Sequence, residues 1–179
     1  MSNIRFTSFP RTQPPPDFTL PVVEAFRKSE ASICTRSLEK GLTSDAVLAA
    51  LRPALVDLGF VVEASKLAAD KIRRPVFFGE NGQADLQYEI DAFHQGWNCG
   101  LEIEAGRGWM CNAVYRDLIQ ALVMVELQTL ILAVANSYRY QSGGKVTISR
   151  DYGNTIAVAD ALFGHSRIVM PYRLVVIGY

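Results

Sequence analysis

The sequence has few cysteines and histidines, the side chains that most often build zinc sites and catalytic triads. Its 179 residues include three cysteines and two histidines, His94 and His165. The cysteines are odd in number and widely spaced, so they indicate neither a disulfide framework nor a zinc site. Two isolated histidines do not support a nucleophile–histidine–acid triad. Also missing are a phosphate-binding Gly-x-x-x-x-Gly-Lys loop and a dinucleotide-binding Gly-x-Gly-x-x-Gly motif after a strand.

An excess of charge of either sign is missing as well. The 18 basic and 18 acidic residues give a formal net charge of zero, which provides no global attraction to nucleic acid or to a membrane, although it does not exclude a local basic patch. The mostly apolar run from Leu118 to Val125 is bounded by Asp117 and Glu126, so no stretch is typical of a transmembrane helix. The N-terminus lacks the apolar run of a signal peptide. We therefore expect a soluble, cytoplasmic protein without a membrane partner.

The chain does contain ample apolar side chain and a local concentration of proline. Hydrophobic residues make up 49% of the sequence, enough for the core of one domain of ordinary size. Pro14, Pro15 and Pro16 are consecutive and follow Pro10, which favours an extended, polyproline-like arm. We predict a proline-rich N-terminal arm over residues 1–19, lying on the surface or on a partner chain, and a single domain over residues 20–179.

Hydrophobic periodicity and turn residues predict helices and strands in a mixed order. The predicted helices span residues 20–39, 43–58, 111–128 and 151–163. The predicted strands span residues 60–63, 76–78, 85–94, 98–105, 129–135, 146–148 and 173–179. Asn81-Gly82 favours a type I′ turn, so the region from 60 to 105 is expected to be a β-meander. The predicted fold class is α/β (α+β), a mixed central sheet with flanking helices.

The stretch from Leu86 to Gln128 organises the rest of the chain, because its two strands carry four carboxylates. These are Glu89, Asp91, Glu102 and Glu104. Residues two apart in a strand point to the same face, so each strand presents its pair together. Gly96-Trp97 is typical of a two-residue type II′ hairpin loop. A hairpin centred there places Asp91 opposite Glu102 and Glu89 opposite Glu104, with Tyr88, Ile90, Ala92, Leu101, Ile103 and Ala105 on the core face.

Four carboxylates on one face of a hairpin need a neutralising partner, because like charges directly opposite each other are destabilising. A divalent cation with oxygen ligands provides one, and Mg²⁺ is usually held by one or two carboxylates together with substrate phosphate. The alternative is a solvated outer face, where aspartate and glutamate are common.

The order of these elements resembles the PD-(D/E)XK nuclease superfamily, which has the restriction-endonuclease-like fold. In that family an aspartate precedes a strand that carries (Asp/Glu)-x-Lys. Ile90-Asp91 is similar to the first element and Glu102-Ile103-Glu104 to the second, with the helix from 111 and the strand from 129 as the continuation. The resemblance covers about residues 43–136. The sequence departs from the pattern at Glu104, where the family usually has lysine, although a minority of restriction enzymes carry Glu-x-Glu.

The resemblance implies a Mg²⁺-dependent endonuclease, with Mg²⁺ or Mn²⁺ as the cofactor and DNA as the substrate. Asp91 and Glu102 would bind the metal directly, and Glu104 would orient or deprotonate the attacking water, directly or through a second metal. The main-chain carbonyl of Ile103 is a further candidate ligand. Arg107 would contact a phosphate or stabilise developing charge; its alternative is a solvated loop arginine.

Other residues are candidates for contacts with nucleic acid. Lys71, Arg73 and Arg74 belong, with Lys66, to the densest basic cluster of the chain, which would contact phosphates without reading sequence. A solvated charged segment is the alternative. Arg116 and Gln120 project from one face of the predicted helix at 111–128, where they would meet DNA, the metal site or only solvent. A homodimer would suit cleavage of both strands of a duplex.

Two further interpretations of the sequence stay open. The first is a non-catalytic member of the same fold that acts as a binding or assembly subunit, which Glu104 and the zero net charge favour. The second is an unrelated α+β protein whose acidic hairpin binds a partner.

Overall fold

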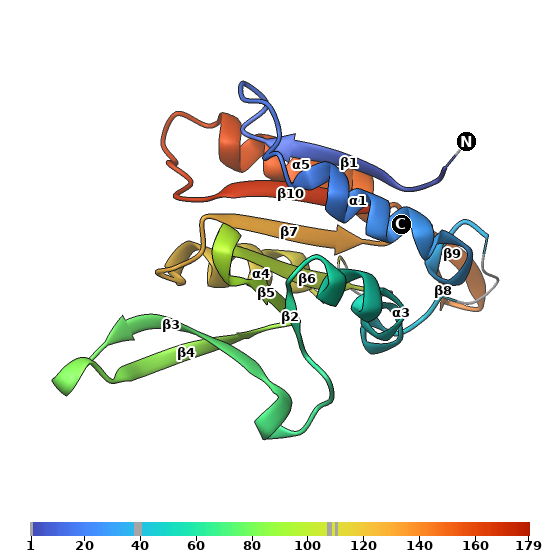
Figure 1. Cartoon of the computed structure of the whole chain (residues 1–179). Helices are drawn as coiled ribbons and strands as arrows, with labels where there is room; N and C mark the ends of the chain where they lie inside the picture. The colour runs from blue at the N-terminus through green and yellow to red at the C-terminus, as the bar shows by residue number, and fades with distance from the viewer. Residues whose placement is uncertain (1, 38–40, 107–108, 110) are drawn as a thin grey trace.

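A six-stranded mixed sheet forms the centre of the computed structural model (Figure 1), which describes residues 2–37, 41–106, 109 and 111–179. From one edge to the other its strands are β1 (Arg5–Phe9), β10 (Arg173–Gly178), β7 (Thr129–Val134), β6 (Cys99–Glu104), β5 (Ala92–His94) and β2 (Val61–Val62). The three central strands, β10, β7 and β6, run parallel to one another. The outer strands pair antiparallel. The prediction of a mixed central sheet with flanking helices is confirmed.

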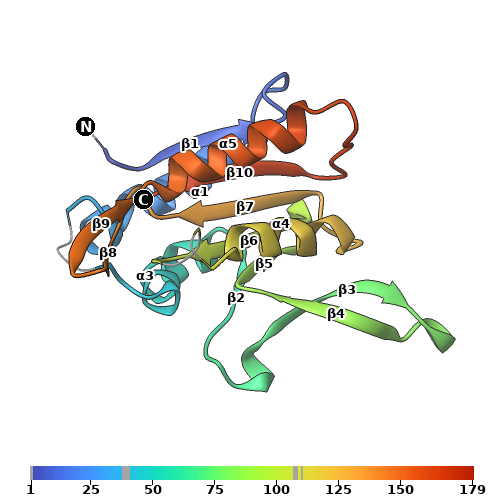
Figure 2. The same cartoon turned by 180° about the vertical axis from the view of Figure 1, so that it is seen from behind.

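Helices cover both faces of this sheet (Figure 2). On one face lie α1 (Thr19–Lys28), α2 (Glu30–Ile33) and α3 (Ser44–Asp57), and on the other α4 (Ala113–Val123) and α5 (Asp151–Gly164). All six residues of β7 are buried between the two layers, because a strand covered on both faces needs a continuous apolar run. No helix in the described part of the chain is long and apolar enough to cross a bilayer.

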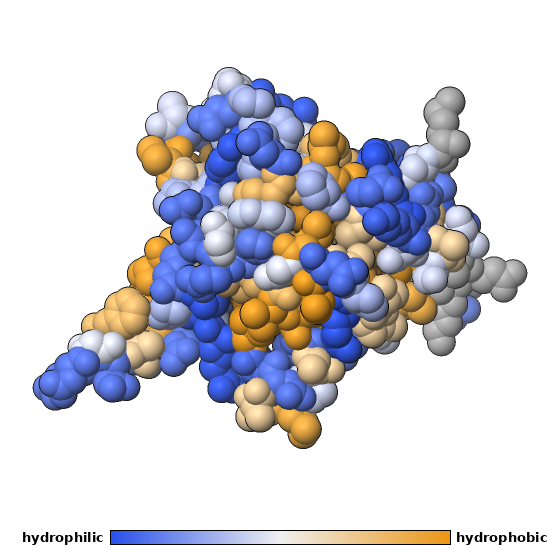
Figure 3. Space-filling view, in the orientation of Figure 1, coloured by the Kyte–Doolittle hydropathy of each residue, from blue (hydrophilic) through white to orange (hydrophobic). Residues whose placement is uncertain are grey.

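Two hairpins lie outside the central sheet. The first, the β3–β4 arm, pairs β3 (Ile72–Phe78) with β4 (Ala84–Ile90) and projects from the body of the protein (Figures 1 and 2). Its apolar part and hydrophilic tip are visible at the lower left of Figure 3. The tip has positive φ at Asn81 and Gly82, as the predicted type I′ turn requires. The second, the β8–β9 hairpin, pairs β8 (Tyr138–Ser142) with β9 (Lys145–Ser149).

Several predicted elements have their expected places in the structure. The helix predicted at 43–58 is α3, and the Thr43 side chain caps it by accepting a hydrogen bond from the Ala46 backbone N–H at 3.3 Å. The buried strand predicted at 129–135 is β7, and the strand predicted at 173–179 is β10. Three short 3₁₀ turns, Ala68–Asp70, Glu80–Gly82 and Gln95–Trp97, complete the described elements.

Other predictions about the architecture are wrong. Residues 5–9 do not form a surface arm: they are β1, which covers the edge of β10, with Ile4 and Phe9 buried. This pairing satisfies the backbone groups along the outer side of β10 and makes β1 the edge strand of the sheet. The region from 60 to 105 is not a simple meander, because β3 and β4 leave the central sheet and only β2, β5 and β6 remain in it. The helix predicted at 20–39 is divided into α1 and α2 at Ser29.

Candidate functional site

The hairpin of β5 and β6 has the register that the sequence predicts. Ala92 lies opposite Leu101 and His94 opposite Cys99. The predicted two-residue type II′ turn is wrong: the loop has four residues, with a 3₁₀ turn and a left-handed Asn98 at φ 46°. The register is nevertheless preserved because the longer loop is still centred between Gly96 and Trp97. Continuing this register by one position places Asp91 opposite Glu102.

The predicted strand at 85–94 is interrupted at Asp91, between β4 and β5. The predicted alternation of core-facing and outward-facing residues does not continue through this position. Ile90 packs in the core cluster on the α4 side of the sheet, whereas Ala92 packs in the cluster on the α3 side. Residues two apart in a regular strand would share a face. The reason is that β4 leaves the sheet to pair with β3, so Glu89 lies opposite Arg73 and not opposite Glu104.

The departure of β4 leaves backbone groups of β6 to be satisfied, and Asp91 does this. Its Oδ2 accepts a hydrogen bond from the Ile103 backbone N–H at 2.8 Å, and its own carbonyl accepts one from the Glu63 N–H at 2.8 Å. Asp91 therefore has a structural task in addition to any role in catalysis, since a buried N–H without a partner is costly.

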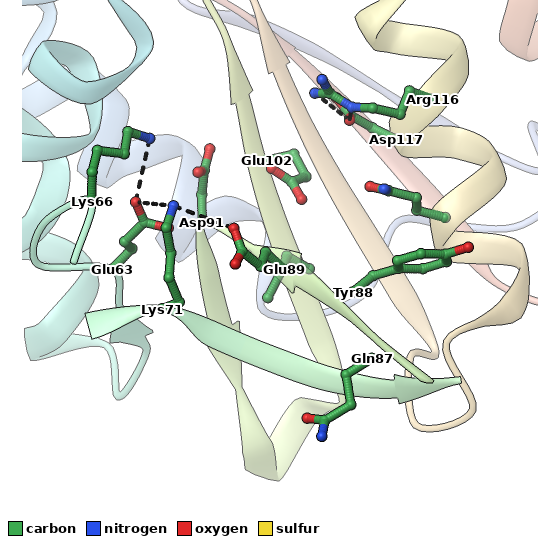
Figure 4. Close-up of a pocket in the computed structure, with 12 residues that line it drawn as sticks. Glu63, Lys66, Lys71, Gln87, Tyr88, Glu89, Asp91, Glu102, Arg116 and Asp117 are labelled. Atoms are coloured by element: carbon green, nitrogen blue, oxygen red, sulfur yellow. Dashed lines mark hydrogen bonds and ion pairs between the residues drawn. The ribbon is translucent and has the colours of Figure 1, made fainter. Parts of the chain in front are cut away.

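A cavity of about 530 Å³ opens between the β3–β4 arm, β6 and α4 (Figure 4). Five acidic side chains from different parts of the chain line it: Glu63 after β2, Glu89 on β4, Asp91 between β4 and β5, Glu102 on β6 and Asp117 on α4. Glu63 and Asp117 are only 4% and 2% exposed. Of the four carboxylates for which a solvated outer face was the alternative, Glu89 is exposed, whereas Asp91, Glu102 and Glu104 are only partly exposed.

Glu104 lies beside the cavity, on the same strand as Glu102. One of its oxygens accepts a 2.8 Å hydrogen bond from Nη2 of Arg116. The same guanidinium group pairs with Asp117 at 2.9 Å. The buried Tyr179 hydroxyl donates to the Glu104 carbonyl at 3.2 Å. Glu104 is thus held by Arg116 of α4 and by Tyr179, the residue that follows β10.

Burial raises the pKa values of the carboxyl groups in this cluster. Burial and the negative charges of Asp117 and Asp91 raise the pKa of Glu104 to about 8. Burial raises the pKa of Glu102 well above its usual value, and Asp91, Asp117 and Glu104 add to the shift. The pKa of Asp91 is raised by burial and by Glu63, against the opposing hydrogen bond from Ile103. Burial also raises the pKa of Asp117. The site consequently favours protonated carboxyl groups unless positive charge enters it.

The predicted nucleic-acid-binding cations are placed among carboxylates. Lys71 binds both oxygens of Glu63 at 2.9 Å and pairs with Glu89 at 3.4 Å, and hydrogen bonding to Glu63 raises its pKa. Arg73 also pairs with Glu89, at 3.5 Å. Lys66 contacts Glu63 at 3.3 Å. Lys66 and Lys71 therefore line the cavity, whereas Arg73 is exposed and does not line it.

The remaining candidates are distributed differently. Arg74 pairs with Glu126, and its guanidinium group lies 4.0 Å from the ring centroid of Phe93. Arg116 and Gln120 line the cavity from α4. Ile103 contributes its N–H to Asp91. Arg107, the predicted phosphate-contacting residue, lies outside the described residues.

Sequence reasoning missed Glu63 and Asp117 as members of the site. Asp117 could have been found, because it falls three residues after Val114 and four before Ala121, on the stripe of α4 that is buried. A charged residue within an apolar helical stripe indicates a buried polar site. Glu63 follows a two-residue strand and offers no such signal.

The donor set of this site is compatible with a hard divalent cation. Its candidate ligands are carboxylate oxygens, and Oδ2 of Asp117 is buried without a hydrogen-bond partner among the described residues. No three or more aspartate, glutamate, histidine or cysteine side chains of residues 2–37, 41–106, 109 and 111–179 are already gathered closely enough to hold an ion. Binding would therefore require the carboxyl groups to draw together and lose protons.

Comparison with known proteins does not assign this chain to a family: no protein-family model and no curated protein matches its sequence.

Proposed function

We propose that the protein is a Mg²⁺-dependent endonuclease with a PD-(D/E)XK-type site that hydrolyses phosphodiester bonds in DNA. The observation that carries this proposal is the acidic cavity lined by Asp91, Glu102 and Asp117, whose Oδ2 is buried without a hydrogen-bond partner in the described part of the chain. Carboxyl groups collected at such an electrostatic cost are most simply explained by a cation that neutralises them.

The topology supports the same proposal. The antiparallel strands β2, β5 and β6 are followed by helix α4 and by β7, which is parallel to β6. This is the order of strand, hairpin, helix and buried strand on which the resemblance to the restriction-endonuclease-like fold depends. The β3–β4 arm is an addition between β2 and β5 and departs from that order.

The residues of the site can be given separate tasks. Asp91, Glu102 and Asp117 would hold the cation, which when bound lowers the pKa of water and stabilises charge on a phosphate oxygen. A bound cation would lower the raised pKa of Glu104, so this group would be ionised and would accept a proton from the attacking water. Arg116 fixes the Glu104 carboxyl at 2.8 Å and so sets the direction in which it can act.

The usual lysine of the family pattern is absent at position 104, but positive charge reaches the cavity from another element. Lys66 and Lys71, which lie between β2 and β3, line the cavity together with the carboxylates. They would contribute the attraction for a phosphate that a lysine at position 104 would otherwise provide.

A specific observation favours a second candidate, a non-catalytic subunit of the same fold. Lys66, Lys71 and Arg116 are each already paired with a carboxylate. In that case these ion pairs would complete the site without a metal, and the cavity would bind a partner or nothing at all.

Metal binding and cleavage distinguish the two candidates. We expect calorimetry with Mn²⁺ to show binding to the wild-type protein, and Mn²⁺-dependent cleavage of plasmid DNA, single-stranded DNA or RNA. Asp91→Asn and Glu102→Gln should abolish both, whereas the control Glu80→Gln, at the exposed tip of the β3–β4 arm, should leave both unchanged. Binding of Mn²⁺ without cleavage of any of these substrates would support the non-catalytic subunit.

A further inference from the structure

The β8–β9 hairpin lies beyond the C-terminal ends of β6 and β7, at the end of the sheet to which Glu104 belongs (Figures 1 and 2). Tyr138 packs closely on Gly106, where an added Cβ would lie 3.0 Å from the tyrosine ring. Gly106 is four residues after Glu102, and four residues of extended chain span at most about 14 Å. The hairpin is therefore within a few nucleotide lengths of the acidic cavity.

The segment that contains the β8–β9 hairpin is basic, whereas the cavity is acidic. Residues 127–150 contain no aspartate or glutamate, but they include Arg139, Lys145 and Arg150. All three are exposed. Whereas the cations around the cavity are paired with carboxylates, none of these three forms an ion pair with any residue that the structure describes. They are available to an external anion.

The position of Arg150 is not explained by helix stability. It immediately precedes Asp151, the first residue of α5, and caps that helix without a side-chain hydrogen bond. The N-terminus of a helix carries a partial positive charge, so a cation is unfavourable there. An anion that approaches this position would interact favourably with both the arginine and the helix N-terminus.

Two tyrosine rings lie on the face of the hairpin that also carries Lys145, which pairs with Ser142, whereas Arg139 pairs with Ile148 on the opposite face. Tyr138, Tyr140, Thr147 and Ser149 share one face of the hairpin, because Tyr138 pairs with Ser149 and Tyr140 with Thr147. The two tyrosine rings are nearly parallel, with centroids 6.0 Å apart and an interplanar angle of 13°. Half-exposed parallel rings beside unpaired cations offer stacking surfaces to bases and ionic contacts to phosphates.

We propose that the β8–β9 hairpin binds a nucleic acid strand, with Lys145 and Arg150 contacting its phosphates and Tyr138 and Tyr140 stacking on its bases. The hairpin holds the part of the strand that flanks the bond in the acidic cavity. This inference rests on the proposed nuclease function, and it assigns nucleic acid binding to a segment other than the basic cluster at residues 66–74.

The test is the binding of fluorescently labelled 30-nucleotide DNA, single-stranded and duplex, measured by anisotropy in EDTA from 50 to 300 mM salt. The double variant Lys145→Gln, Arg150→Gln should bind at least about tenfold more weakly. Its slope of log K against log salt should be smaller by about 1.4–1.8, because each lost phosphate contact removes about 0.7–0.9. The control double variant Lys28→Gln, Arg167→Gln changes the net charge equally at exposed positions outside the hairpin and should retain wild-type binding.

A small substrate separates failure of this inference from failure of the proposed function. Bis(p-nitrophenyl) phosphate carries no flanking nucleotides for the hairpin to hold, so its Mn²⁺-dependent hydrolysis should be the same in the wild type and in both double variants. Unchanged DNA affinity in the hairpin variant would overturn the inference, as would failure of the wild-type protein to bind either DNA. In either case, continued hydrolysis of the small diester would leave the proposed metal-dependent chemistry standing. Thermal melting of each variant shows whether it is folded.

Discussion

Raising the pH should destabilise the metal-free protein, in contrast to the usual effect of ionising carboxylates that are paired in the folded state. An acid whose pKa is higher in the folded than in the unfolded chain holds its proton more tightly when folded. The pKa of Glu104 rises from 4.5 to about 8 on folding. Its contribution to stability is therefore fully present below pH 4.5 and is lost as the pH rises towards 8.

The size of this effect follows from the shift. At about 1.4 kcal/mol per pKa unit, the titration of Glu104 alone should lower the free energy of unfolding by roughly 3 kcal/mol between pH 5 and pH 8. For a chain of this length that corresponds to a fall in melting temperature of roughly 6–12 °C. The pKa values of Asp91, Glu102 and Asp117 are shifted in the same direction, so they steepen the fall.

Thermal melting followed by circular dichroism, in EDTA at pH 5, 6, 7 and 8, measures this dependence. Glu104→Gln should flatten the curve and should be more stable than the wild type at pH 8, whereas the exposed control Glu80→Gln should follow the wild type. Mn²⁺ should restore the melting temperature most strongly at pH 8, because it then competes with fewer protons. A wild-type melting temperature that is constant or rises from pH 5 to pH 8 in EDTA would refute the assignment of raised pKa values.

Three other substitutions test individual contacts. Asp91→Ala should cost about 1–3 kcal/mol, because it leaves the Ile103 N–H without an acceptor; Asp91→Asn keeps an acceptor there, so chemical denaturation should show a smaller loss. Asp117→Asn removes a buried charge and should raise the melting temperature in EDTA while abolishing the increase caused by Mn²⁺; an increase that survives would exclude Asp117 as a ligand. Gly100→Ala should cost about 1–3 kcal/mol through overpacking, since the new Cβ would lie 2.2 Å from Cδ1 of Ile90; an unchanged denaturation midpoint would contradict this packing.

Local sequence patterns predicted the elements that depend on residues close together in the sequence. The Thr43 cap of α3, the continuous apolar run of β7 and the register of β5 against β6 are all encoded by neighbouring residues. The pairing of β1 with β10 could not be predicted in this way, because it joins Arg5–Phe9 to residues more than 160 positions later. Sequence proximity likewise suggested that Lys71 and Arg73 form an outer patch, whereas the fold brings Glu63 and Glu89 against them.

The break at Asp91 shows why the site was only partly predictable. A regular hairpin would have placed Glu89 and Glu104 together, but the departure of β4 replaces Glu104's expected partner with residues of α4. In the resulting cluster the cost of burial outweighs the ion pairs with Arg116, since the pKa values of Asp91, Glu102, Glu104 and Asp117 are all raised. Replacement of buried charges by apolar residues often stabilises a protein. The cluster therefore opposes folding stability in the metal-free protein, as expected of a site whose residues serve binding or catalysis.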